Sequence, residues 1–196
     1  MSTTSAVAPG IHAGSSSDLI TPSAAQKWAG LVRILLGFTF MWAFLDKTFG
    51  FGFATTKAWM FGTGDGSPTA GFLKFGANPN GPFVGFFNGL APTSPSAIIN
   101  WLFMLALLGA GVGLMLGIGM RISCIGASLL LLSMYLAVAP WAKYEDKGGS
   151  TVASNNPILD EHIIYAATLM VLMLVMAGRY WGLGRMWEEK APSWLQ

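Results

Sequence analysis

The sequence predicts an all-α membrane protein: a four-transmembrane-helix bundle with a long aromatic-rich loop between helices 1 and 2. Three observations support this class. The 196-residue chain is 53% hydrophobic and only 10% charged, with a mean hydropathy of +0.55, a composition typical of integral membrane proteins. Four segments are apolar over about 20 residues, the length that crosses a hydrocarbon core of ~30 Å. The interval between the first two is far longer than a turn between helices needs.

These segments define the predicted organisation. We expect a flexible N-terminal tail over residues 1–26, because it is rich in Ser, Thr, Ala and Gly and lacks the basic start and apolar core of a signal peptide. A transmembrane domain then covers residues 27–190, and a C-terminal tail covers residues 191–196. The expected helices are about 27–50, 98–119, 121–142 and 158–180, and the expected loop is about 51–97.

The second and third segments are the clearest of the four. They carry no charge and are separated only by the neighbourhood of Arg121, so we expect a tight helical hairpin. Gly109, Gly113 and Gly117 recur every four residues in the second segment. Such spacing lets helix backbones approach closely, which predicts a packing face, either within the chain or toward a partner.

The loop after the first segment is rich in aromatic residues, which are costly to leave in water. Ser67-Pro68-Thr69 resembles a helix N-cap followed by proline at the first helical position. We therefore expect short helices near residues 68–75 and 82–88, and a loop that caps the bundle.

Basic residues indicate the orientation. With four crossings, the side that holds both termini carries six basic residues, including all four arginines, and the other side carries five. We predict that both termini are cytoplasmic.

Three charges in the first segment need an explanation. Arg33 lies six residues past Lys27, about 9 Å along a helix. It can extend back to the membrane surface, pair inside the bundle, or bind an anionic head group or substrate. Asp46 and Lys47 reach the far boundary of the membrane by the same count. We expect Lys47 to pair with Asp160 or Glu161 of the fourth segment.

Asp46 is near the C-terminal end of the predicted helix, whose negative partial charge disfavours a carboxylate. Its expected partner is His162 or an N–H group of the loop.

The start of the fourth segment is the richest polar cluster. An Asn cap, Pro157 at the first helical position and acidic residues nearby are what a helix start prefers. The functional alternative uses His162 and Tyr165, which are three residues apart and share a helix surface. They can contact quinone carbonyls while Glu161 relays protons.

Composition also excludes several classes. The small net charge of +2 is spread along the chain, which indicates no nucleic-acid partner. Cys124 is the only cysteine, and His12 and His162 are the only histidines. No metal or haem site is therefore expected within one chain.

Parts of the sequence resemble the DoxX/DoxD family of small four-helix membrane proteins, especially its actinobacterial branch. The resemblance rests on Arg33-Ile34-Leu35-Leu36-Gly37, on the run from Trp42 to Gly52, on the piece from Gly66 to Leu73, and on Asn156-Pro157 through His162 and Tyr165. It implies a multi-pass protein of a bacterial cytoplasmic membrane, and it transfers no established catalytic residue.

DoxD proteins resemble the large subunit of a thiosulfate:quinone oxidoreductase. The resemblance thus implies a membrane subunit of quinone-linked respiratory electron transfer, with a menaquinone or ubiquinone as cofactor and with lipids and other membrane subunits as partners. The first alternative is a non-catalytic accessory subunit of a cytochrome bc-oxidase type supercomplex. The second is a small transporter or lipid-binding protein that uses Arg33.

Overall fold

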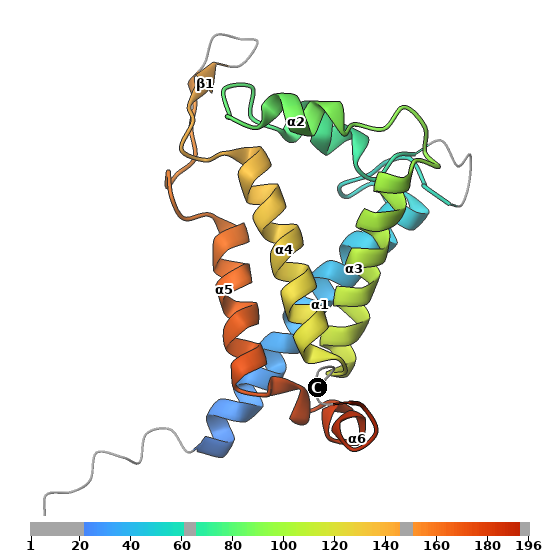
Figure 1. Cartoon of the computed structure of the whole chain (residues 1–196), viewed down its shortest axis with the longest axis vertical. Helices are drawn as coiled ribbons and strands as arrows, with labels where there is room; N and C mark the ends of the chain where they lie inside the picture. The colour runs from blue at the N-terminus through green and yellow to red at the C-terminus, as the bar shows by residue number, and fades with distance from the viewer. Residues whose placement is uncertain (1–21, 61–65, 146–150, 193–196) are drawn as a thin grey trace, which may run out of the picture.

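The chain is mostly helical, and three of its helices are candidate membrane spans. The computed structural model describes residues 22–60, 66–145 and 151–192. Helices α1 (Pro22–Phe49), α3 (Ile98–Leu116) and α4 (Met120–Val138) are each long and apolar enough to cross a membrane (Figure 1). The helical membrane class is thereby supported. Most of the predicted N-terminal tail lies outside the described residues, and α1 begins at Pro22 rather than at residue 27.

The fourth predicted segment differs from its expected bounds of 158–180. Helix α5 (Glu161–Leu174) has 14 residues, about 21 Å at 1.5 Å per residue. It ends because Met176 adopts a left-handed conformation with φ of 52°. A short 3-10 turn, η3 (Ala177–Arg179), and helix α6 (Gly184–Glu188) follow.

The start of α5 corrects the predicted cap. Asp160, not an asparagine, is the N-cap: its carboxylate accepts a hydrogen bond from the N–H of Ile163 at 3.2 Å. The side chain of Asn156 instead accepts from the N–H groups of Ile158 and Leu159, in the turn before the helix. A carboxylate at this position also favours the positive end of the helix dipole.

Helices α3 and α4 form the expected tight hairpin. Gly117 and Gly119 have φ of 73° and 54°, a left-handed conformation that glycine adopts without strain. The N–H of Gly117 bonds the carbonyl of Gly113 at 2.8 Å and closes α3. From this turn the two helices diverge toward the opposite end of the molecule (Figure 1).

The main core lies along the shared length of the long helices and α5. Leu114, Cys124 and Leu169 are fully buried in it. Helix α1 packs chiefly against α3, and α5 packs against α4. The α1–α3 contact is close because a Cβ on Gly37 would lie 2.8 Å from the backbone nitrogen of Met115, and one on Gly111 would lie 2.9 Å from that of Met41.

The long loop covers the diverging end, as predicted. It contains the π-helical turn η2 (Phe72–Gly76) and helix α2 (Val84–Gly89), and α2 lies across the ends of α3 and α4 (Figure 1). Leu73, Ala77 and Phe87 form a second buried cluster with Ala137 of α4. We call residues 66–91 the cap. A small antiparallel hairpin of β1 (Tyr144–Glu145) and β2 (Thr151–Val152) connects α4 to α5.

Candidate functional site

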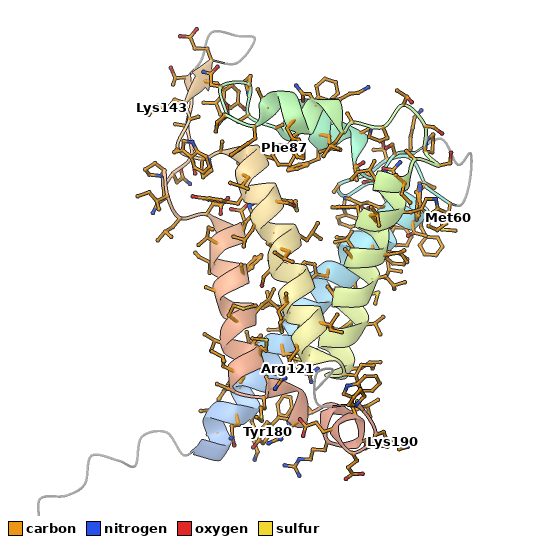
Figure 2. All side chains as sticks on the ribbon, in the orientation of Figure 1. Met60, Phe87, Arg121, Lys143, Tyr180 and Lys190 are labelled. Atoms are coloured by element: carbon orange, nitrogen blue, oxygen red, sulfur yellow. The ribbon has the colours of Figure 1, made fainter. Side chains whose placement is uncertain are left out.

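The divergence of α3 and α4 leaves a cavity of about 990 Å³ beneath the cap. Its walls are mostly apolar and come from both helices: Ile99, Leu102, Phe103, Ala106, Leu107, Leu130, Leu131 and Met134. Phe87 of α2 lines the covered end, whereas Arg121, Tyr180 and Lys190 lie at the opposite end of the molecule (Figure 2). A concave apolar site of this size lies at the upper end of the ~300–1,000 Å³ typical of small-molecule sites.

Two buried asparagines hold the cap over this cavity. Asn100 of α3 is completely buried; its Oδ1 accepts from the hydroxyls of Ser67 and Thr69 at 3.1 and 2.7 Å. Its Nδ2 donates to the Pro95 carbonyl at 3.0 Å. The cap is therefore attached to the start of α3.

At the other side, Asn78 attaches the cap to the end of α4. Its Nδ2 donates to the carbonyls of Ala139 and Ala142 at 3.2 and 2.7 Å, and its backbone N–H bonds the carbonyl of Ala137 at 2.9 Å. Our sequence reasoning missed both asparagines. An asparagine two residues into an otherwise apolar helix was the available signal for Asn100.

Lys47 brings positive charge to the cavity. Its half-buried side chain lines the cavity from α1 and makes no hydrogen bond or ion pair with any described residue. Lys57 is the other charged residue of the described lining, which contains no carboxylate. The predicted pairing of Lys47 with Asp160 or Glu161 is not found among the described residues: the Asp160 carboxylate contacts His162 and the N–H of Ile163, and Glu161 is exposed.

Asp46 binds N–H groups of the loop, which was one of the two predicted alternatives for its partner. Only 1% of it is exposed, and its carboxylate accepts from the N–H groups of Phe53 and Ala54 at 3.1 and 2.9 Å. Gly50 and Gly52, with φ of 68° and 90°, turn the chain back toward it. Asp46 thus fixes the exit of α1 and does not line the cavity.

Arg33 is fully buried and binds backbone carbonyls only. Its Nη1 donates to the carbonyls of Leu114 and Met115, and its Nη2 donates to those of Tyr180 and Trp181 at 3.1 Å. Among these four, the two α3 carbonyls lie at the negative end of that helix. Pairing inside the bundle, one of the predictions for Arg33, is confirmed. The guanidinium has no exposed atom to offer.

Glycines surround the Arg33 guanidinium. A Cβ on Gly182 would lie 2.8 Å from its Nη2, and one on Gly117 would lie 2.9 Å from its Nη1. A Cβ on Gly184 would overlap the carbonyl of Gly178. We call Arg33 and these four glycines the Arg33 knot.

The three predicted catalytic residues do not share one cavity. His162 is buried, with its Nδ1 2.8 Å from Asp160 Oδ2, and Glu161 is exposed beside it. Tyr165 alone of the three lines the cavity. Its hydroxyl makes no hydrogen bond with the described residues, so it is available to a ligand.

The predicted glycine face divides into three environments. Gly113 packs directly against Ser123 of α4, and Gly117 ends α3 within the Arg33 knot, so both serve packing inside the chain. A Cβ on Gly109 would meet no atom within 4 Å. Sequence reasoning missed Gly37 and Gly111, which form the close α1–α3 contact.

Comparisons with protein-family models, with curated protein sequences and with solved structures find no match for this chain. The DoxX/DoxD resemblance therefore stays a prediction.

Proposed function

We propose that the chain crosses a bacterial cytoplasmic membrane four times, with both termini cytoplasmic. The fourth crossing consists of the 14-residue helix α5 and residues 175–180, which continue the chain past the end of that helix. Support comes from the packing of α5 along α4 and from its exposed apolar side chains Ile164, Val171 and Leu174. A lipid-facing surface needs such side chains. This arrangement is the four-helix bundle of the sequence prediction.

Within that membrane, we infer that the chain is a subunit of quinone-linked respiratory electron transfer and binds a menaquinone or ubiquinone. The observation that carries this proposal is the apolar cavity between α3 and α4. A quinone is a polar ring on an apolar tail, and the cavity combines apolar helix walls with hydroxyl groups near the cap. The DoxX/DoxD resemblance supports the same ligand. A partner subunit supplies the electrons, as in a thiosulfate:quinone oxidoreductase.

In the proposed quinone complex, Tyr165 contacts the quinone head. Its phenol lines the cavity from α5 and donates to one ring carbonyl. The isoprenoid tail then lies along Leu102, Ala106 and Leu130, which line the same cavity. His162, paired with Asp160, lies outside the lining and keeps a structural role at the start of α5.

Quinone binding to the Tyr165→Phe variant tests this assignment. We expect the Kd for a short-tailed naphthoquinone or benzoquinone to rise about fivefold, because one neutral hydrogen bond is worth about 1 kcal/mol. Isothermal titration of the purified full chain in nanodiscs measures it. The matched control is Tyr144→Phe, in β1 and outside the cavity, which should bind like the wild type. Absence of saturable quinone binding by the wild type would contradict the proposed function.

The accessory-subunit alternative has one specific observation in its favour. Gly109 of α3 and Gly126 of α4 leave open space on exposed helix surfaces, where a helix of another subunit can approach closely. Co-isolation with a respiratory complex, combined with no quinone binding, would favour this alternative. The transporter or lipid-binding alternative receives no support from Arg33, because that side chain is fully buried and donates to backbone carbonyls.

A further inference from the structure

The charge of the cavity lining is not explained by a neutral ligand. Lys47 and Lys57 are the charged residues of the described lining, and both are positive. Thr39, Ser67 and Thr69 line the same cavity, and their hydroxyls donate to the Leu36 carbonyl and to Asn100. An ammonium group beside apolar walls loses part of its hydration, a loss that proteins ordinarily offset with an opposite charge.

The nearest carboxylate, Asp46, acts electrostatically on Lys47 but forms no direct ion pair with it. Asp46 precedes Lys47, but its two carboxylate oxygens accept from the loop N–H groups of Phe53 and Ala54. It is also 1% exposed, whereas Lys47 is half-buried at the cavity wall. Adjacent side chains on a helix do not face each other. The N–H groups of the Lys47 ammonium therefore have no acceptor among the described residues and can donate to a group inside the cavity.

We propose that the cavity binds an anionic amphiphile whose carboxylate or phosphate pairs with Lys47 while its hydrocarbon chain lies between α3 and α4. The Lys47 ammonium matches the anionic head, and charge complementarity of this kind selects a ligand. The apolar walls match the chain. The divergence of α3 and α4 beneath the cap gives that chain its place, because the same two helices are held together at their other end by the 117–119 turn.

This inference goes beyond the proposed function, since it rests on the charge of Lys47 and does not require that quinone binds. The two ligands share the apolar walls, so they compete for the cavity. They differ in the group that meets the cap end: Tyr165 is assigned to the neutral quinone, and Lys47 is assigned to the anion.

A fluorescent fatty acid, cis-parinarate, and its neutral methyl ester test the proposal on the purified full chain. We expect saturable binding of parinarate to the wild type and at least tenfold weaker binding of the ester. Lys47→Met should weaken parinarate binding at least tenfold and leave ester binding unchanged, whereas Lys47→Arg should retain parinarate. Lys74→Met is the matched control: Lys74 is an exposed lysine of η2, outside the lining, and its removal should leave binding unchanged.

Displacement of bound parinarate identifies the head group. Stronger displacement by lysophosphatidate than by palmitate supports the proposal with a phosphate head, and the reverse supports it with a carboxylate head. Zwitterionic lysophosphatidylcholine should displace least.

Three results would overturn the proposal: no saturable parinarate binding, equal affinity for acid and ester, or equal losses in Lys47→Met and Lys74→Met. The last two would mean that Lys47 acts only as a charge at the end of a helix. Failure of quinone binding is a separate result. A chain that binds parinarate through Lys47 but binds no quinone contradicts the proposed function and leaves this inference intact.

Discussion

Two cations on the same helix have opposite environments. Arg33 and Lys47 are both on α1, 14 residues apart by their numbers (47 − 33), which is about 21 Å along the axis. Arg33 is completely buried and donates to four backbone carbonyls. Lys47 is half-buried at a cavity wall and has no hydrogen-bond or ion-pair partner among the described residues.

The difference lies in what surrounds each charge. At the Arg33 end, α3 and α4 are joined by a three-residue turn, and the chain after α5 packs onto that turn through glycines. At the Lys47 end, the same two helices have separated, and a cap held by Asn78 and Asn100 covers the space. Arg33 therefore joins backbone segments at one end of α1, whereas Lys47 at the other end is available to a ligand in the cavity.

Removal of the Arg33 guanidinium should have the largest effect. In Arg33→Met the carbonyls of α3 and of residues 180–181 lose their donors, and each buried acceptor without a partner costs ~1–3 kcal/mol. We expect a loss of about 3 kcal/mol or more in the free energy of unfolding, or failure to fold. Unfolding in mixed micelles, followed by circular dichroism, measures it.

Arg33→Lys is the control for charge alone. Lysine keeps the positive charge but offers a single ammonium in place of a planar guanidinium that reaches two pairs of carbonyls. We expect Arg33→Lys to recover only part of the loss. Full recovery would show that the charge at the end of α3 matters and that the four-carbonyl geometry does not.

The glycines of the Arg33 knot give the next largest effect. Gly184→Ala places a Cβ 2.5 Å from the carbonyl carbon of Gly178, which forces the α6 segment away from the turn. Overpacking of this kind costs ~1–3 kcal/mol. Thermal unfolding of the same purified protein measures the change. The matched substitution is Gly109→Ala in α3, where a Cβ meets nothing.

Gly109→Ala should be neutral or stabilising by up to about 1 kcal/mol, because alanine favours a helix interior over glycine. Equal destabilisation by the two substitutions would mean that the Arg33 knot is no more tightly packed than the exposed face of α3.

The sequence predicted the elements better than it predicted their partners. The length of the apolar segments located α1, α3 and α4. The tight hairpin was predictable because two uncharged segments are separated only by the neighbourhood of Arg121. The loop N–H partners of Asp46 were predictable because they are seven and eight residues away. The contacts of Arg33 are 81 to 148 residues away along the chain, and backbone carbonyls carry no sequence signal, so nothing local identified them.

The same reason explains the error at Lys47. Opposite charges at the ends of two helices predict a pair, but Asp160 is satisfied locally by its own helix and by His162. The cavity depends on the angle between α3 and α4, which no residue pattern specified. Tyr165 was identified as a ligand-contacting residue from its spacing to His162, yet its relevance comes from the cavity that it lines.

Lys47→Met should have the smallest effect on stability. The substitution removes a favourable interaction with the negative end of α1, worth ~0.3–1 kcal/mol, and it also removes the cost of holding an ammonium beside apolar walls. Because these terms oppose each other and no described hydrogen bond or ion pair is lost, the free energy of unfolding should change by less than about 1 kcal/mol. The same mixed-micelle assay used for Arg33→Met measures it. A loss as large as that of Arg33→Met would show that Lys47 holds the fold together, and the contrast between the two ends would then disappear.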